Sequence, residues 1–233
     1  MTQIVLHQWA FSPFCTKVRK MMDYKGIEYT TKNYNGFLAL EAKRLSKTGK
    51  LPVLEVDGEM IQDSRVIARY LDTHFPEKPL TPSDPTQVSK AEIFQDWADE
   101  SLYFYEIYFR TKYTKAMFKV GDLLGEGRPF YEKYFLGPAL GYQLGKAIKQ
   151  QGIARNSKAL VEERFLHLMD QVDRQLEASP WLAGDAPSIA DFALAGQLIE
   201  VVRTGHLNPQ LQTLPHLWAW INKMQDLPCH EKR

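Results

Sequence analysis

The chain has few cysteines, almost no net charge and no long apolar run. Its two cysteines, Cys15 and Cys229, among 233 residues are too few for a disulfide framework and suit a reducing compartment. The 29 basic and 28 acidic residues leave a formal net charge of +1, which favours neither a nucleic-acid nor an anionic-membrane partner. No apolar stretch reaches the ~20 residues of a membrane-spanning helix. The N-terminus lacks the regions of a signal peptide, and we therefore expect a cytoplasmic protein.

Metal binding is not indicated either. The six histidines show no ligand spacing, and the pair Cys229-His230 has no further ligand cluster nearby in the sequence. The expectation is a protein without a metal site.

A proline-rich segment divides the sequence into two parts. Residues 75–85, FPEKPLTPSDP, contain four prolines in eleven residues and cannot sustain a helix or a central strand. Before it, strand and helix patterns alternate in the order βαβ and then ββα, whereas only helical patterns follow it. We expect an α/β domain over 1–77, a linker over 78–87 and an all-helical domain over 88–233.

The predicted elements are defined by their residue ranges. Strands are expected near 4–9, 27–32, 51–56 and 60–61, and helices over 13–25, near 37–46 and from 63 onwards. In the second part, helical patterns cover 87–119, 160–176, 188–203 and 215–226. Repeated glycine and proline over 121–156 predict two short helices joined by loops.

The turn after the first expected strand carries the segment Ser12-Pro13-Phe14-Cys15. Serine is a good N-cap and proline a good first helical residue, so an ordinary helix start explains the pair without any chemistry. Its place at the end of a strand adds a second interpretation, because the helix N-terminus favours a thiolate there. A serine hydroxyl at that point can donate a hydrogen bond to the sulfur of a bound thiol.

Two other motifs flank the third and fourth expected strands. A cis bond between Leu51 and Pro52 would turn the preceding backbone groups outward to pair with an extended peptide, although proline at a strand start needs no such role. Asp63 and Ser64 open the next helix either as an ordinary N-cap or as a site for a carboxylate.

In this order and spacing, the three motifs resemble the glutathione transferase superfamily. The supporting segments are residues 12–29, 50–72 and 181–194, and the resemblance is thin only over 115–157. In that family the last segment starts a buried helix through a Ser-x-x-Asp capping box with a role in folding, matched here by Ser188 and Asp191. The resemblance implies an α/β thioredoxin-like N-terminal domain, an all-α C-terminal helical domain and a homodimer.

The resemblance also implies site residues. Ser12 takes the position of the catalytic serine or cysteine, and its SPF context is most similar to serine-type transferases such as the plant tau class. Val53 would pair its backbone with the cysteinyl part of glutathione, and Asp63 with Ser64 would hold the γ-glutamyl end. The positions implied in glutathione binding are Phe14, Lys50, Leu51, Pro52, Val53, Asp63 and Ser64.

One stretch departs from the family pattern. Members often carry Asn-Pro before the glycine that precedes the third strand, whereas this chain has Ser46-Lys47. Lys50 matches a basic position that often reaches the glycyl carboxylate, and Lys47 is a second candidate for the same contact.

Cys15 admits two interpretations. Relatives with a cysteine at the position of Ser12 perform redox chemistry, but here the outer position is serine and the inner one is cysteine. Cys15 is therefore either a packed core residue or a thiol that forms mixed disulfides with glutathione.

The pocket for the electrophile is expected beside the aromatic stretch 94–109. Phe11, Tyr105 and Tyr108 are the candidates, although an aromatic stripe at helical spacing is usually core packing. Three functions follow. The first is conjugation of glutathione, as co-substrate and without another cofactor, to a small hydrophobic electrophile. The second is a glutathione-dependent thiol reductase that uses Cys15, and the third is a non-catalytic binding or regulatory protein on the same fold.

Overall fold

The computed structural model describes residues 2–232, without the side chains of residues 133, 135 and 136. Its first part is a four-stranded sheet with the order β2-β1-β3-β4. The strands are β1 (Ile4–Gln8), β2 (Thr30–Asn33), β3 (Val53–Val56) and β4 (Glu59–Gln62). β1 and β2 run parallel, while β3 pairs antiparallel with both β1 and β4.

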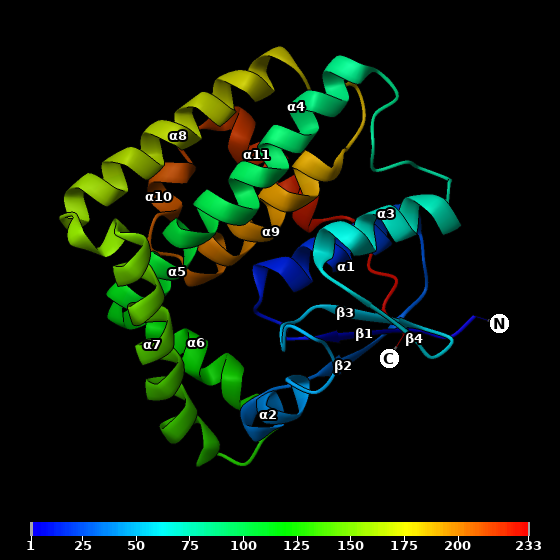
Figure 1. Cartoon of the computed structure of the whole chain (residues 1–233). Coiled ribbons are helices and arrows are strands. Elements are labelled where there is room, and N and C mark those ends of the chain that lie inside the picture. Colours follow the sequence, from blue (N-terminus) through cyan, green and yellow to red (C-terminus); the bar gives the residue numbers. More distant parts are fainter. Residues whose placement is uncertain (1, 233) are drawn as a thin grey trace.

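Helices cover both faces of this sheet. α1 (Pro13–Lys25) and α3 (Ser64–His74) lie on the face toward the helical part, and the short segments η1 (Gly36–Leu38) and α2 (Ala39–Ala42) lie on the other side (Figure 1). α1 ends at Gly26, whose φ of 73° is the left-handed conformation that closes many helices.

The second part is entirely helical (Figure 1). Its elements are α4 (Pro85–Asp96), the π-helical turn η2 (Trp97–Leu102), α5 (Tyr103–Lys112), α6 (Thr114–Gly125), α7 (Glu132–Gln151), η3 (Ile153–Arg155), α8 (Lys158–Ala178), α9 (Ile189–Thr204), α10 (Asn208–Leu211) and α11 (Pro215–Gln225). α9 is buried along most of its length and packs against α1, which joins the two parts.

The start of α9 has the expected capping box. The Asp191 carboxylate accepts from the backbone N–H of Ser188 at 2.9 Å and from the N–H of Leu182 at 3.0 Å. It also accepts from Trp220 Nε1 at 3.2 Å, so one buried side chain ties α9 to its preceding loop and to α11. This confirms a structural role for Asp191.

Two segments differ from the prediction. α4 begins at Pro85, inside the range expected as linker, because Asp84 caps it by accepting from the N–H groups of Thr86 and Gln87. Residues 132–151 form one helix, α7, despite the glycines and Pro138. Packing of α7 against α5 and α6 outweighs the low helix propensity of these residues.

No helix among residues 2–232 has the length and apolar character needed to cross a membrane. In the same range, no group of three or more His, Cys, Asp or Glu side chains is arranged to hold a metal ion.

Candidate functional site

The register of the sheet brings the three sequence motifs to one edge, which is formed by the ends of β1 and β4 and the start of β3. Val53, the first residue of β3, pairs with His7 near the end of β1 and with Gln62 at the end of β4. The turn that carries Ser12 follows β1, and the start of α3 follows β4. Pro52, which directly precedes Val53, therefore lies between them at the same edge.

Ser12 is the N-cap of α1. Its φ and ψ of −82° and 128° are extended, and its Oγ accepts from the backbone N–H of Cys15 at 3.5 Å. Its own N–H donates to Trp9 O at 2.9 Å, which fixes the turn after β1. Because capping uses Ser12 Oγ as an acceptor, the hydroxyl hydrogen can donate either to the neighbouring Cys15 sulfur or to a ligand. The half-buried Ser12 can therefore cap the helix and also hold a thiolate.

Cys15 is fully buried in the first turn of α1. Burial raises the pKa of its thiol, and a hydrogen bond with Ser12 and the nearby Arg19 offset this only in part. Such an environment disfavours the thiolate, which is the form that reacts with disulfides.

The bond between Leu51 and Pro52 is cis, which is one of the two possibilities that the sequence left open. Val53 has β1 on one side and β4 on the other, so its backbone has no free edge for an extended ligand. The backbone of Leu51 lies just before the paired residues of β3. Leu51 is thus a second candidate, beside Val53, to pair with a peptide.

Asp63 and Ser64 open α3 at this edge. Asp63 is exposed, has a φ of 73° and uses one carboxylate oxygen to accept from the N–H groups of Arg65 at 2.8 Å and Val66 at 3.3 Å. A positive φ at a residue other than glycine is uncommon and often marks a functional position. Ser64 is buried as the first residue of the helix. An anionic ligand bound at this N-terminus would contact Ser64. It would also lie beside the carboxylate of Asp63, which already caps the helix.

An ion cluster with a buried centre at Lys17 and Asp99 fastens both helix starts to η2. Lys17 Nζ in α1 lies 2.7 Å from Asp99 Oδ2, and Arg65 Nε in α3 lies 3.3 Å from the same oxygen. Arg65 also pairs with Asp96 at 2.8 Å. Burial lowers the pKa of Lys17, while Asp99 opposes that shift. Sequence reasoning missed this cluster because it joins three distant segments and has no local spacing.

The loop before β3 places two exposed lysines. Ser46 Oγ bonds the N–H and the carbonyl of Lys50, each at 3.1 Å, and the N–H of Lys47 donates to Gln62 Oε1 at 3.0 Å. Ser46 thus stabilises the loop in place of the family's Asn-Pro. Both lysine side chains are exposed near this edge and stay candidates for a ligand carboxylate.

The predicted electrophile residues are not brought together. Phe11 is 3% exposed and packs with Val120 and Leu124 of α6 in a small separate cluster. Tyr108 is 2% exposed in the main core, and the half-buried Tyr105 packs against Phe165 of α8. The half-buried Phe14 lies against Tyr103, with ring centres 5.2 Å apart. Most of the aromatic stretch therefore belongs to the core, and among the three predicted electrophile residues Phe11 is the one beside the turn of Ser12.

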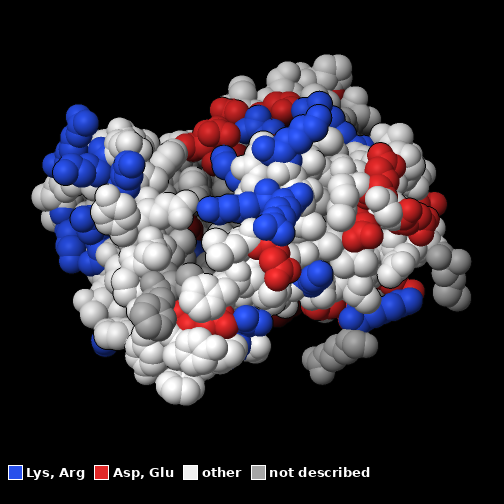
Figure 2. Space-filling view, turned by 60° about the horizontal axis from the view of Figure 1, so that its bottom comes forward, with Lys and Arg blue, Asp and Glu red and all other residues white. Residues whose placement is uncertain are grey.

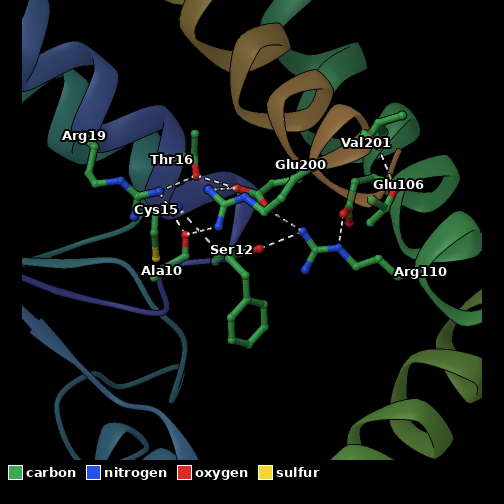
Figure 3. Close-up of polar contacts among 12 residues, drawn as sticks. Ala10, Ser12, Cys15, Thr16, Arg19, Glu106, Arg110, Glu200 and Val201 are labelled. Carbon is green, nitrogen blue, oxygen red and sulfur yellow. Dashed lines mark hydrogen bonds and ion pairs between the residues drawn. The ribbon is translucent and has the colours of Figure 1, made fainter. Parts of the chain in front are cut away.

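The turn of Ser12 is also anchored to the helical part. Arg110 Nη2 in α5 donates to Phe11 O at 2.7 Å and to Glu200 of α9 at 3.1 Å (Figure 3). Thr16 of α1 donates to Glu200 at 2.9 Å, and Glu106 forms an ion pair with Arg110. Burial raises the pKa of Glu106 to about 7, against the lowering effect of Arg110.

Comparison with known proteins adds to this geometry. Residues 6–79 match the family model "Glutathione S-transferase, N-terminal domain" and residues 150–223 match "Glutathione S-transferase, C-terminal domain", which together cover more than half of the chain. The chain is 28% identical over 205 residues to "Failed axon connections" of Drosophila melanogaster, covering 81% of this chain and 47% of that protein.

Two further relatives carry transferase names. One is a probable glutathione S-transferase, MSR-1, of Nicotiana plumbaginifolia, 35% identical over 105 residues, covering 43% of this chain and 47% of that one. The other is the isoprene-epoxide–glutathione S-transferase of Rhodococcus sp. (strain AD45), 25% identical over 224 residues, covering 92% of this chain and 91% of that one. The chain spans about half the length of the first curated relatives that it matches.

Solved structures agree on the fold. The β-etherase LigF from Sphingobium sp. strain SYK-6 is 19% identical, with a TM-score of 0.71 over 98% of this chain and 97% of that one. FzlA from C. crescentus is 20% identical, with a TM-score of 0.69 over 98% and 90%. A sheet of this order, a cis-proline before β3, a capped α1 and two matching family models lead to one conclusion: the chain belongs to the glutathione S-transferase superfamily.

Proposed function

We propose that the protein conjugates glutathione to a small hydrophobic electrophile and that Ser12 stabilises the attacking thiolate. The observation that carries this proposal is the geometry of Ser12. Its oxygen accepts the cap hydrogen bond of α1 at the helix N-terminus, where its O–H hydrogen can turn from Cys15 to the sulfur of a bound thiol. Hydrogen bonding and the helix dipole both favour the ionised form of a thiol held there.

Glutathione would lie along the edge that the three motifs share. The backbone of Leu51 pairs with its cysteinyl part, Ser64 receives the γ-glutamyl carboxylate, and Lys50 or Lys47 meets the glycyl carboxylate. This arrangement places the sulfur beside Ser12 Oγ. Holding both reactants close lowers the entropic part of the barrier.

The proposed reaction needs no cofactor besides glutathione as co-substrate. The glutathione thiol loses its proton to solvent, and Ser12 donates a hydrogen bond to the resulting thiolate. The sulfur lone pair forms a bond to the electrophilic carbon, while the carbon–halogen bond of an aryl halide breaks and the halide leaves with its electron pair. With an epoxide, the carbon–oxygen bond opens instead and the alkoxide takes a proton from water. The name of the Rhodococcus relative supports a trial of epoxides.

The family resemblance also supports a homodimer, which the chain's apparent mass in light scattering would test. A mass of one chain at micromolar concentration would contradict that part of the proposal.

Variants of Ser12 and Cys15, which lie three positions apart at the start of α1, test the chemistry. Ser12→Ala is expected to lower kcat for an aryl halide about 100-fold, the range for losing one hydrogen-bond donor to a developing charge. Cys15→Ala, the control in the same helix turn, is expected to keep kcat within about threefold. A loss of activity in Cys15→Ala but not in Ser12→Ala would support a thiol reductase. Tight glutathione binding with no turnover of either electrophile class would support a non-catalytic protein.

A further inference from the structure

Large aromatic side chains on α6, on α7 and in the turn between them are exposed to solvent. They are Phe118, Phe130, Tyr131, Tyr134 and Tyr142. Phe118 is 72% exposed and Tyr142 is 75% exposed. Single exposed apolar residues are common on protein surfaces, whereas a group of them marks a surface that binds something.

Phe118 and Tyr142 share one side of the helix pair. Met117 of α6 and Gly141 of α7 line the narrow space between the two helices, so these two residues face each other. The next residue along an α-helix is turned by about 100°. Because α6 and α7 pack as an antiparallel pair (Figure 1), that turn brings Phe118 and Tyr142 to the same side. This side points away from the core, into which α6 buries Val120.

Three exposed lysines lie at one end of the same side. Lys115 is in the first turn of α6, and Lys146 and Lys149 are in the last two turns of α7. Antiparallel packing therefore brings the three to the same end of the pair. Lys115 precedes Phe118 by three residues, and Lys146 follows Tyr142 by four, so helical spacing places these lysines beside the aromatic rings.

The charge of this side is positive. Among the side chains that the structure describes, lysine ion pairs are made by lysines other than these three. Asp122 of α6 is acidic and lies on the same side, so three positive charges stand against one negative charge. Figure 2 shows Lys and Arg side chains gathered at the left of the molecule, the side on which α7 lies in Figure 1. We call the surface formed by Lys115, Phe118, Tyr142, Lys146 and Lys149 the α6–α7 face.

Aromatic rings beside lysines indicate a lipid partner. Protein–protein interfaces are enriched in aromatic residues but depleted of lysine. Helices that lie on an anionic membrane carry both, because the rings enter the boundary of the acyl chains and the ammonium groups stay among the headgroups. Tyrosine suits this boundary, since its ring is apolar and its hydroxyl stays in water. The formal net charge of +1 describes the whole chain and conceals this local excess.

We propose that the α6–α7 face binds the surface of a membrane that contains anionic lipids. The rings of Phe118 and Tyr142 enter the boundary between headgroups and acyl chains, and the three lysines contact the anionic headgroups. The face belongs to α6 and α7, whereas the proposed glutathione site is formed by the sheet edge, α1 and α3. The proposal therefore goes beyond the transferase activity and does not depend on it.

Flotation of the full chain with lipid vesicles tests the assignment. The probes are vesicles of phosphatidylcholine with about 30% phosphatidylserine and vesicles of phosphatidylcholine alone. We expect affinity for the anionic vesicles to be at least about tenfold higher, because each lysine near an anionic surface contributes to binding. Raising NaCl from about 0.05 M to about 0.5 M should weaken binding, since salt screens these contacts.

An aromatic variant tests the insertion of the rings. Phe118→Gln is expected to lower the affinity for anionic vesicles about tenfold, because a polar side chain does not enter the acyl boundary. Ile93→Gln is the matched control, since Ile93 is 70% exposed on α4 and lies outside the α6–α7 face. It should leave the affinity within about twofold.

A lysine variant tests the contact with headgroups. Lys146→Gln combined with Lys149→Gln is expected to lower the affinity for anionic vesicles at least about tenfold. The control removes two exposed lysines elsewhere, Lys32 of β2 and Lys223 of α11, by the same substitution. Its affinity should stay within about twofold of the unaltered chain. Urea unfolding of every variant shows that it is folded.

Three results would overturn the proposal. The first is no flotation with either kind of vesicle at about 1 mM lipid. The second is equal loss of affinity in the face variants and in their controls. The third is a dimer of the unaltered chain that becomes a monomer in Phe118→Gln, as measured by light scattering, which would show that a second copy covers this face. Transferase activity enters none of these measurements, so the two proposals can fail separately.

Discussion

Gly196 of α9 lies directly against the carbonyl oxygen of Pro13, the first residue of α1. A Cβ at Gly196 would lie 2.5 Å from that oxygen and 3.1 Å from Lys17 Cβ. The absence of a side chain at this point lets α9 approach the first turn of α1 closely. Because Pro13 follows Ser12, the same contact sets the position of the proposed catalytic residue relative to the helical part.

Gly196→Ala is expected to destabilise the protein and lower its transferase activity. The added methyl group meets backbone, which cannot move aside as a side chain can, so the cost should be about 1–3 kcal/mol in the free energy of unfolding. Urea unfolding measures it. Gly145→Ala in α7 is the matched control, because a Cβ there has nothing within 4 Å and should stabilise by roughly 0.5 kcal/mol. Equal unfolding midpoints for the two variants would contradict this account of α1 and α9.

The buried pair of Lys17 and Asp99 predicts a large loss of stability when one partner is removed. Asp99→Leu leaves the Lys17 ammonium buried with no carboxylate in contact, which should cost about 3–5 kcal/mol. Asp170→Asn on α8 breaks the exposed pair with Arg174 and should cost no more than about 1 kcal/mol. Denaturant unfolding of both variants gives the comparison. Similar losses in the two would show that the buried pair is not the link proposed between α1 and η2.

The raised pKa of Glu106 predicts a specific pH dependence. Its pKa is about 7 in the folded protein, against an ordinary value of 4.5. Between these values the folded state binds more protons than the unfolded state, so this residue makes stability fall as pH rises from about 4.5 to about 7. The change amounts to roughly 3 kcal/mol.

Glu106→Gln should abolish that part of the dependence. The stability of the variant relative to the unaltered chain is expected to increase steadily between pH 5 and pH 7 and to level off above it, as followed by urea unfolding at a series of pH values. A stability difference that stays constant over this range would show that Glu106 is ionised in the folded protein throughout.

Ser64 should affect the affinity for glutathione more than the rate of reaction. It lies at the start of α3, where the γ-glutamyl carboxylate is proposed to bind, and it does not contact the sulfur in that arrangement. Ser64→Ala is expected to raise KM for glutathione about tenfold, with kcat changed less than about twofold. Steady-state kinetics with varied glutathione separates the two constants, and Ser89→Ala on the exposed face of α4 serves as control. A fall in kcat at unchanged KM would place the sulfur near α3 instead.

Local sequence patterns predicted the features that depend on a few neighbouring residues. The cap formed by Ser12 and the end of α1 before Gly26 follow from backbone chemistry within one turn of chain, whereas the capping box of Asp191 was implied by the family resemblance and the cis bond at Pro52 was one of two possibilities. These are the features that define the fold and the edge of the sheet where the site lies.

Features that depend on contacts between distant segments were not predictable in the same way. α7 continues through Pro138 because α5 and α6 pack against it, and propensity alone cannot reveal that support. The pairing of Lys17 with Asp99 joins residues 82 positions apart. Similarly, Tyr108 is a core residue because of the helices that surround it, although its spacing suited a pocket wall equally well.

The pKa of the glutathione thiol in the complex tests the central claim most directly. Titration of the thiolate absorbance of bound glutathione should give a pKa near 7 for the unaltered chain and for Cys15→Ala. For Ser12→Ala it should return toward the ordinary thiol value of about 8.5. An unchanged pKa in Ser12→Ala, or a rise confined to Cys15→Ala, would show that Ser12 does not stabilise the thiolate.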